Sequence, residues 1–181
     1  MTRQFLFLTS SSRPEGNALL LARQAAKALD TQPRWIDLTD PSLPPFRDLR
    51  PDHALPTGPL ADLMQAMRAA TDLVFVAPIY WYALPAPAKQ LLDHWSGWLD
   101  APETGFADWV KGKRVHLITS RADPDPTVTH LPEAMLKRSI QWLGMHWAGA
   151  LHGIGDAPGD ILSDTPAIAA ATRFLAAPKG A

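Results

Sequence analysis

Short apolar runs recur along the chain, and most of them are followed by a segment in which apolar residues return at helical spacing. The runs at 5–8 and 72–77 are almost continuously apolar, which is typical of strands buried on both faces of a sheet. More mixed runs at 34–38, 114–119 and 147–154 predict further strands. The pattern therefore predicts five strands separated by helices.

The segments between these runs place apolar residues three and four positions apart, so that they fall on one helix face. The predicted helices span 19–29, 60–67, 84–99 and 131–145, and a last one begins near Thr165. Two connections lack this periodicity. The first is a proline-rich surface loop at 40–58, long enough to suggest a function, and the second is a polar segment at 100–112.

Strands that alternate with helices form a parallel sheet with helices on both faces, which is an α/β fold. The chain has 181 residues, and we expect residues 1–181 to form a single domain. The strand order 2-1-3-4-5 is one of two common solutions, and its switch point lies between the first and third strands. The loops at 9–18 and 78–85 would then face each other across one crevice.

The first of these loops joins a buried strand to a helix start and carries hydroxyl groups, Arg13 and Asn17. Hydroxyls, free backbone N–H groups and the positive end of a helix together suit a phosphate group. A polar turn that only caps the helix explains the same residues equally well, and Glu15 opposes the charge of Arg13. The loop is neither a Walker loop nor a Rossmann motif, because the required glycine spacing is missing.

The second loop begins with Pro78-Ile79-Tyr80-Trp81, directly after a buried strand. Its backbone offers polar groups to the edge of a heterocycle, and its aromatic rings offer faces for stacking. The alternative is that the rings at 80–82 simply pack into the protein, and we expect at least one of them to do so. We expect Trp95 and Trp98, on the helix that follows, to lie in the core or in a subunit interface.

The composition excludes several classes of function. Basic and acidic residues nearly cancel, 17 against 18, which argues against broad electrostatic binding of nucleic acid or of an anionic membrane. The chain contains no cysteine, so disulfides, thiol catalysis and cysteine-ligated iron–sulfur clusters are excluded. Neither a signal peptide nor a membrane span is recognisable, so we expect a soluble cytoplasmic protein.

Other candidate chemistry is weak. The histidines show no metal-binding spacing, and there is no Gly-x-Ser-x-Gly elbow of a serine hydrolase. We expect His116 to be a core histidine, and we place His94 and His146 on helices without an evident partner. Asp123 and Asp125 alternate with prolines and predict an exposed turn. We therefore expect no metal site.

Two motifs, in this order, resemble those of a known family. Ser11-Ser12-Arg13-Pro14-Glu15-Gly16-Asn17-Ala18 is similar to the phosphate loop Ser-Pro-Arg-x-x-Gly-Asn-Ser/Thr of the flavodoxin-like NAD(P)H-dependent FMN reductases. Pro78-Ile79-Tyr80-Trp81, with the segment from Pro87 to Asp93, is similar to that family's Pro-Val/Ile-Tyr-Trp and Leu-Lys-x-x-x-Asp segment. The ending at 153–161 also looks like this family, and within it the chain resembles the branch related to iron–sulfur flavoproteins.

The resemblance implies a flavodoxin-like fold with bound FMN. The residues implied for FMN binding are Ser11, Ser12, Arg13, Asn17 and Ala18 in the phosphate loop, Pro78, Ile79, Tyr80 and Trp81 beside the isoalloxazine, and Thr119, Ser120 and Arg121 at its far edge. Two departures matter. Ala18 replaces a usual hydroxyl residue, which removes one hydrogen bond to the phosphate, and the cysteines that hold the cluster in iron–sulfur flavoproteins are absent.

The implied activity is that of an oxidoreductase in which NAD(P)H reduces FMN, and the flavin then reduces a quinone-like or other small aromatic acceptor. Since the flavin carries the chemistry, no catalytic side chain is required. Two alternatives remain: a flavodoxin-type electron carrier, which the near-neutral charge disfavours, and an interaction scaffold without flavin, which Ala18 and Glu15 would suit. The resemblance also suggests a homodimer.

Overall fold

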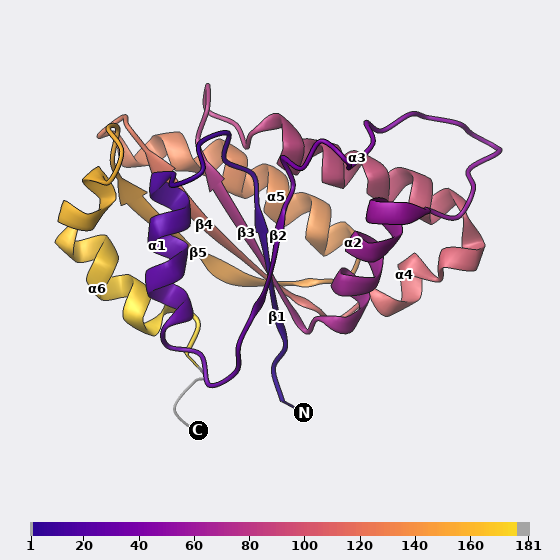
Figure 1. Ribbon diagram of the computed structural model, residues 1–181, viewed down its shortest axis with the longest axis horizontal. Coiled ribbons are helices and arrows are strands. Elements are labelled where there is room, and N and C mark those ends of the chain that lie inside the picture. The colour runs from indigo at the N-terminus through magenta and orange to yellow at the C-terminus, as the bar shows by residue number, and fades with distance from the viewer. Residues whose placement is uncertain (1, 177–181) are drawn as a thin grey trace.

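The computed structural model describes residues 2–176, which form one parallel sheet between two layers of helices (Figure 1). The strands are β1 (Phe5–Thr9), β2 (Arg34–Asp37), β3 (Asp72–Pro78), β4 (Arg114–Arg121) and β5 (His146–Ile154). Their order in the sheet is β2-β1-β3-β4-β5, and each neighbouring pair is parallel. The predicted flavodoxin-like order 2-1-3-4-5 is therefore confirmed.

The helices divide between the two faces of this sheet. They are α1 (Asn17–Ala26), α2 (Gly58–Ala69), α3 (Ala86–Asp100), α4 (Phe106–Trp109), α5 (His130–Trp142) and α6 (Thr165–Phe174). Short 3₁₀ helices lie at Pro102–Thr104, Pro126–Thr129 and Asp160–Ser163. In Figure 1, α1 and α6 lie on one side of the sheet and α2 to α5 on the other, with the carboxyl ends of the strands at the top.

Alternating residues of the central strands supply two separate apolar cores. Phe5 and Phe7 of β1 pack with the inner faces of α1 and α6, whereas Leu6 and Leu8 pack with the α2, α3 and α5 layer. Phe7 and Leu8 are both fully buried. Each such side chain contributes roughly 1.5–3 kcal/mol by leaving water, so the apolar run of β1 accounts for its central place.

The segment at 100–112 differs from its prediction as a polar connection. It contains a 3₁₀ turn and the single turn α4, whose Phe106 is 1% exposed. The ring of Phe106 packs edge-on against Trp98 at 5.4 Å and is tilted against Trp95 at 5.9 Å between centroids. A single helical turn is too short to show periodicity, which is why the sequence pattern missed it. The core position expected for Trp95 and Trp98 is confirmed.

Two histidines differ from their predicted surroundings. His146 is the first residue of β5 rather than part of a helix. His94 lies on α3 as expected, but its Nε2 has a partner, the carbonyl of Pro44 at 2.9 Å, in the loop at 40–58. A carbonyl oxygen can only accept, so Nε2 carries a proton and donates. Burial lowers the pKa of His94 more than the bond to Pro44 raises it.

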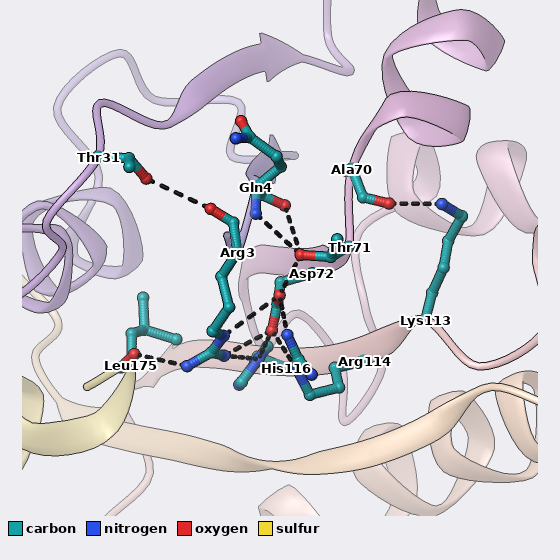
Figure 2. Close-up of polar contacts among 10 residues, drawn as sticks. All are labelled: Arg3, Gln4, Thr31, Ala70, Thr71, Asp72, Lys113, Arg114, His116 and Leu175. Carbon is teal, nitrogen blue, oxygen red and sulfur yellow. Dashed lines mark hydrogen bonds and ion pairs between the residues drawn. The ribbon is translucent and has the colours of Figure 1, made fainter. Parts of the chain in front are cut away.

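A buried ionic cluster closes the amino edge of the sheet (Figure 2). Asp72, the first residue of β3, is fully buried and accepts hydrogen bonds from the guanidinium groups of Arg3 and Arg114. His116 lies 3.0 Å from the same carboxylate and is 3% exposed, which confirms the expected core histidine. Arg3 also donates to the carbonyl of Leu175 at 3.1 Å. The cluster therefore ties the two ends of the described chain to the central strands.

Candidate functional site

The loops after β1 and β3 meet at the carboxyl edge of the sheet. The two strands are paired up to Thr9 and Val76, so the segments that follow them leave the sheet at the same level. Beyond it, the Ser12 hydroxyl lies 3.3 Å from the Tyr80 hydroxyl and links the two loops directly. The loops thus flank one crevice, as the strand order predicted.

A pocket of about 200 Å³ lies in this crevice. Its lining consists of Ser11, Arg13, Gly16, Asn17, Pro78, Ile79, Tyr80, Ser120, Arg121, Ala122, Gly155 and Asp156. Most of the residues expected at the site are therefore brought together, from segments more than a hundred positions apart. Four expected residues, Ser12, Ala18, Trp81 and Thr119, lie outside the lining.

The start of α1 forms one end of the pocket. Gly16 precedes the helix in an extended conformation, and no side chain of the described residues caps the helix. The Ser11 hydroxyl accepts the Arg13 N–H at 3.2 Å, and a Cβ on Gly16 would lie only 2.5 Å from that hydroxyl oxygen. The interpretation of this loop as a mere helix cap is therefore not supported, because its hydroxyls are used elsewhere and the positive helix end stays open to an anion.

Asn17 also contacts the loop that follows β5, and the sequence pattern did not predict this contact. Its Nδ2 donates to the carbonyl of Ala157 at 3.0 Å, and its Oδ1 accepts the N–H of Gly159 at 3.0 Å. A Cβ on Gly155 would lie 2.8 Å from the Asn17 amide nitrogen, so glycine permits the close approach. The signal was available: this loop follows the fifth strand, and all parallel strands end at the same edge.

The end of β4 forms the opposite wall. Ser120 and Arg121 are nearly buried, and the Arg121 Nη1 donates to the carbonyl of Asp123. Thr119 is fully buried and its hydroxyl lies 2.8 Å from Nδ1 of His152, so its side chain faces away from the pocket. Side chains alternate along a strand, which places Ser120 and Thr119 on opposite faces.

The aromatic loop is a tight hairpin rather than a packed platform. Tyr80 and Ala83 exchange two backbone hydrogen bonds, at 3.1 and 3.0 Å. The two residues between them have positive φ, 50° for Trp81 and 62° for Tyr82, which is unusual for bulky side chains. The rings are 45%, 94% and 51% exposed at positions 80, 81 and 82. The expectation that one of them packs inward is wrong, because this turn directs the side chains outward.

Comparison with known proteins agrees with the strand order. The sequence profile of a family described by its flavodoxin-like fold matches residues 3–173. This chain belongs to that family. A relative from Bacillus subtilis strain 168, named as the NAD(P)H-dependent FMN-containing oxidoreductase YwqN, is 30% identical over 175 residues, which cover 93% of this chain and 94% of the relative. The resemblance to flavodoxin-like reductases is thereby confirmed.

Two further proteins are similar to this chain, one in sequence and one in fold. An iron–sulfur flavoprotein of Methanocaldococcus jannaschii is 27% identical over 172 residues, which cover 87% of this chain and 86% of that protein. The solved structure of the Trp repressor binding protein from Bacillus subtilis superposes with a TM-score of 0.80 at 23% identity, covering 98% of this chain and 100% of that one. The name of the Methanocaldococcus relative refers to an iron–sulfur centre, whereas this chain contains no cysteine that could bind a cluster.

The electrostatics of this flavodoxin-like site favour an anion. Arg13 and Arg121 contribute two permanent positive charges to the pocket, against the one carboxylate of Asp156. Arg13 is exposed at the mouth, and its Nη1 lies 3.5 Å from the carbonyl oxygen of Asp156. Among residues 2–176, no helix is long and apolar enough to cross a membrane, and no group of histidine and acidic side chains suits a metal ion.

Proposed function

We propose that this protein is an FMN-dependent oxidoreductase that takes electrons from NAD(P)H and passes them to a small quinone-like or other aromatic acceptor. The observation that carries the proposal is the uncapped start of α1, which opens into a positively charged pocket at the switch point of a flavodoxin-order sheet. The named activity of the 30% identical relative supports it.

The residues of the pocket fit FMN in two parts. Ser11, Arg13 and the backbone from Gly16 to Ala18 would hold the phosphate, where the helix end and Arg13 both attract negative charge. Ala18 is 1% exposed, so its contribution is its backbone N–H, which needs no side-chain hydroxyl. The side chain of Asn17 would support the site indirectly, because its hydrogen bonds hold the loop of Ala157 and Gly159 against the phosphate loop.

The flavin ring would lie outside the enclosed part of the pocket. A volume of about 200 Å³ is below the about 300–1,000 Å³ of typical ligand pockets, so the enclosed space suits the phosphate end. The backbone of Pro78 to Tyr80 and the wall of Ser120 and Arg121 would then border the ring edges. FMN, when bound, supplies hydride acceptance and donation, and the protein orients its ring and limits access of water.

The exposed rings of Trp81 and Tyr82 would contact the acceptor. They directly follow Tyr80, which lines the pocket, and large exposed aromatic side chains commonly mark binding surfaces. A planar aromatic acceptor suits them, since stacking needs no specific hydrogen bonds. As part of the proposal, the protein acts as a homodimer in which this hairpin borders the substrate position.

The test is a titration of flavin-free protein with FMN, followed by anaerobic addition of NADPH and, separately, NADH. We expect FMN to bind and at least one of the two nucleotides to bleach its yellow colour. Loss of the charge-assisted contact in Arg13→Ala should cost about 1.5–3 kcal/mol of binding, which is roughly 10- to 150-fold in affinity. The control is Arg173→Ala, an exposed arginine on α6 that is not part of the pocket lining.

The possible outcomes separate the parts of the proposal. Unchanged FMN affinity in Arg13→Ala would place the phosphate elsewhere. Protein that binds FMN but is reduced by neither NADPH nor NADH would be an electron carrier rather than this enzyme. Protein that takes up no FMN would rule out the proposed function altogether.

A further inference from the structure

A second, larger cleft adjoins the candidate flavin site. It has a volume of about 580 Å³ and lies between the first turns of α5 and the carboxyl ends of β4 and β5. Its lining consists of Arg121, Pro126, Thr129, His130, Glu133, Ala134, Lys137 and His152, which together define the α5 cleft. Arg121 also lines the flavin pocket, so the two spaces are neighbours. The size is that of a small-molecule site.

A chain of hydrogen bonds runs along one wall of the α5 cleft. Nε2 of His152 lies 3.1 Å from Oε2 of Glu133, and its Nδ1 lies 2.8 Å from the Thr119 hydroxyl. Burial lowers the pKa of His152 more than Glu133 raises it, so the imidazole is neutral. The consistent arrangement is that Nε2–H donates to Glu133 and that Thr119 donates to Nδ1.

The hydrogen-bonded series Thr119–His152–Glu133 resembles a nucleophile–histidine–carboxylate triad, but its geometry does not allow that chemistry. The Thr119 hydroxyl belongs to a residue that is fully buried, so no substrate can reach it. The effect of the series is instead that His152 hydrogen-bonds to the carboxylate of Glu133. The one carboxylate of the cleft is thereby turned toward His152 and held there.

The remaining charges of the α5 cleft, those of Arg121 and Lys137, are positive and form no ion pair among residues 2–176. Lys137 is exposed, and it forms no ion pair among residues 2–176, even though Glu133 lies four positions earlier on the same helix. Arg121 is 9% exposed; its Nη1 donates to the carbonyl of Asp123, whereas its Nε has no hydrogen-bond partner within the described chain. The 3₁₀ turn Pro126–Thr129 runs directly into α5, and the Asp125 carboxylate accepts the N–H of Thr127 at 2.8 Å, so this helix start is capped. Two permanent cations, Arg121 and Lys137, thus share the cleft with one carboxylate, Glu133, which is engaged by His152.

We propose that the α5 cleft binds an anionic oxygen group, a phosphate, sulfonate or carboxylate, carried by one of the two substrates that share the flavin. The proposal rests on the proposed function for the identity of the carrier, although anion binding itself does not depend on turnover. Arg121 and Lys137 would contact the anion, and the common wall at Arg121 would direct the rest of the molecule toward the flavin ring. The same chemistry could come from the 2′-phosphate of NADPH or from an acidic group on the acceptor.

The test uses FMN-loaded protein and two pairs of probes that differ only in the anionic group. One pair is adenosine 2′,5′-bisphosphate and AMP, and the other is a naphthoquinone with and without a sulfonate, with binding measured by calorimetry. We expect Lys137→Ala to weaken the more anionic member of at least one pair about tenfold, as for one lost charge-assisted contact, while the other member changes less than about twofold. The matched control is Arg138→Ala, the next residue, which is also exposed but does not line the cleft.

A second variant tests the sign of the electrostatics. Glu133→Gln keeps an oxygen that can accept from His152 and removes the negative charge, so the same probe should bind more tightly. A loss in the phosphate pair would identify the reductant as the carrier, and a loss in the sulfonate pair would identify the acceptor. Equal affinities of Lys137→Ala and the wild type for both pairs would overturn the proposal, as would weaker binding in Glu133→Gln. Because these are binding measurements, failure of both NADPH and NADH to reduce the flavin would count against the proposed function alone.

Discussion

Asp72 allows the sharpest prediction about stability. Its carboxylate is fully buried and receives two contacts from Arg114, at 2.8 and 2.7 Å, and two from Arg3, at 3.3 and 2.5 Å (Figure 2). Asp72→Asn preserves the shape of the side chain but removes the charge and turns an NH₂ donor toward guanidinium groups that can only donate. The substitution therefore leaves two cations without their common anion.

The magnitude follows from how deeply the cluster is buried. Removing one partner of a fully buried ion pair costs about 3–5 kcal/mol. The side chains of Arg3 and Arg114 are 22% and 41% exposed, so both can recover part of their hydration in the variant. We therefore expect a loss of about 2–4 kcal/mol in the free energy of unfolding, equivalent to a fall of about 4–16 °C in Tm for a chain of this size.

The assay is urea unfolding followed by tryptophan fluorescence, without added flavin so that cofactor binding does not contribute. The control is Asp93→Asn, which removes an exposed ion pair with Lys89 on α3 and should cost less than about 0.5 kcal/mol. If Asp72→Asn costs no more than this control, the cluster does not stabilise the fold as argued.

The pH dependence supplies a second test of the same cluster. Burial raises the pKa of Asp72, but hydrogen bonds from His116, Arg114 and Arg3 together hold that pKa well below its usual value. A carboxyl whose pKa is lower in the folded state stabilises the protein above its unfolded pKa of about 3.9, and this contribution is lost as the pH falls further. The difference in stability between wild type and Asp72→Asn should therefore be full near neutral pH and shrink below about pH 4. A difference that stays constant down to pH 2 would contradict the assignment.

Two other predictions concern the loops of the site. Gly155→Ala should destabilise the protein by about 1–3 kcal/mol and weaken FMN binding, because the new Cβ would lie 2.8 Å from both the Asn17 amide and the backbone nitrogen of Ile161. Wild-type FMN affinity in a folded Gly155→Ala protein would show that this loop does not shape the pocket. The double change Trp81→Asn with Tyr82→Gly suits the positive φ of the hairpin, so urea unfolding should show equal or higher stability, while reduction of an aromatic quinone becomes slower. Unchanged quinone reduction would remove the rings from the acceptor site.

Much of the architecture was predictable because it depends on neighbours in sequence. The apolar runs of β1 and β3 and the periodicity of the helices report burial directly, and their alternation implies a parallel sheet. The start of α6 at Thr165 could also be placed, and the structure adds the reason: the Asp164 carboxylate accepts the N–H of Ala167 at 3.0 Å. The meeting of the loops at 9–18 and 78–85 followed from the strand order alone.

Contacts between residues distant in sequence were decided only by the tertiary structure. Asp72 begins an apolar run and gives no sign that Arg3 and Arg114, 69 and 42 positions away, will surround it. The same holds for the bond from Asn17 to Ala157, 140 positions apart, and for the line from Thr119 through His152 to Glu133. The aromatic residues after β3 were visible from the start, but their exposure depends on the backbone turn at Trp81 and Tyr82. Periodicity records which face of an element is buried, whereas partners across the sheet are set by strand order and register, to which no local pattern is sensitive.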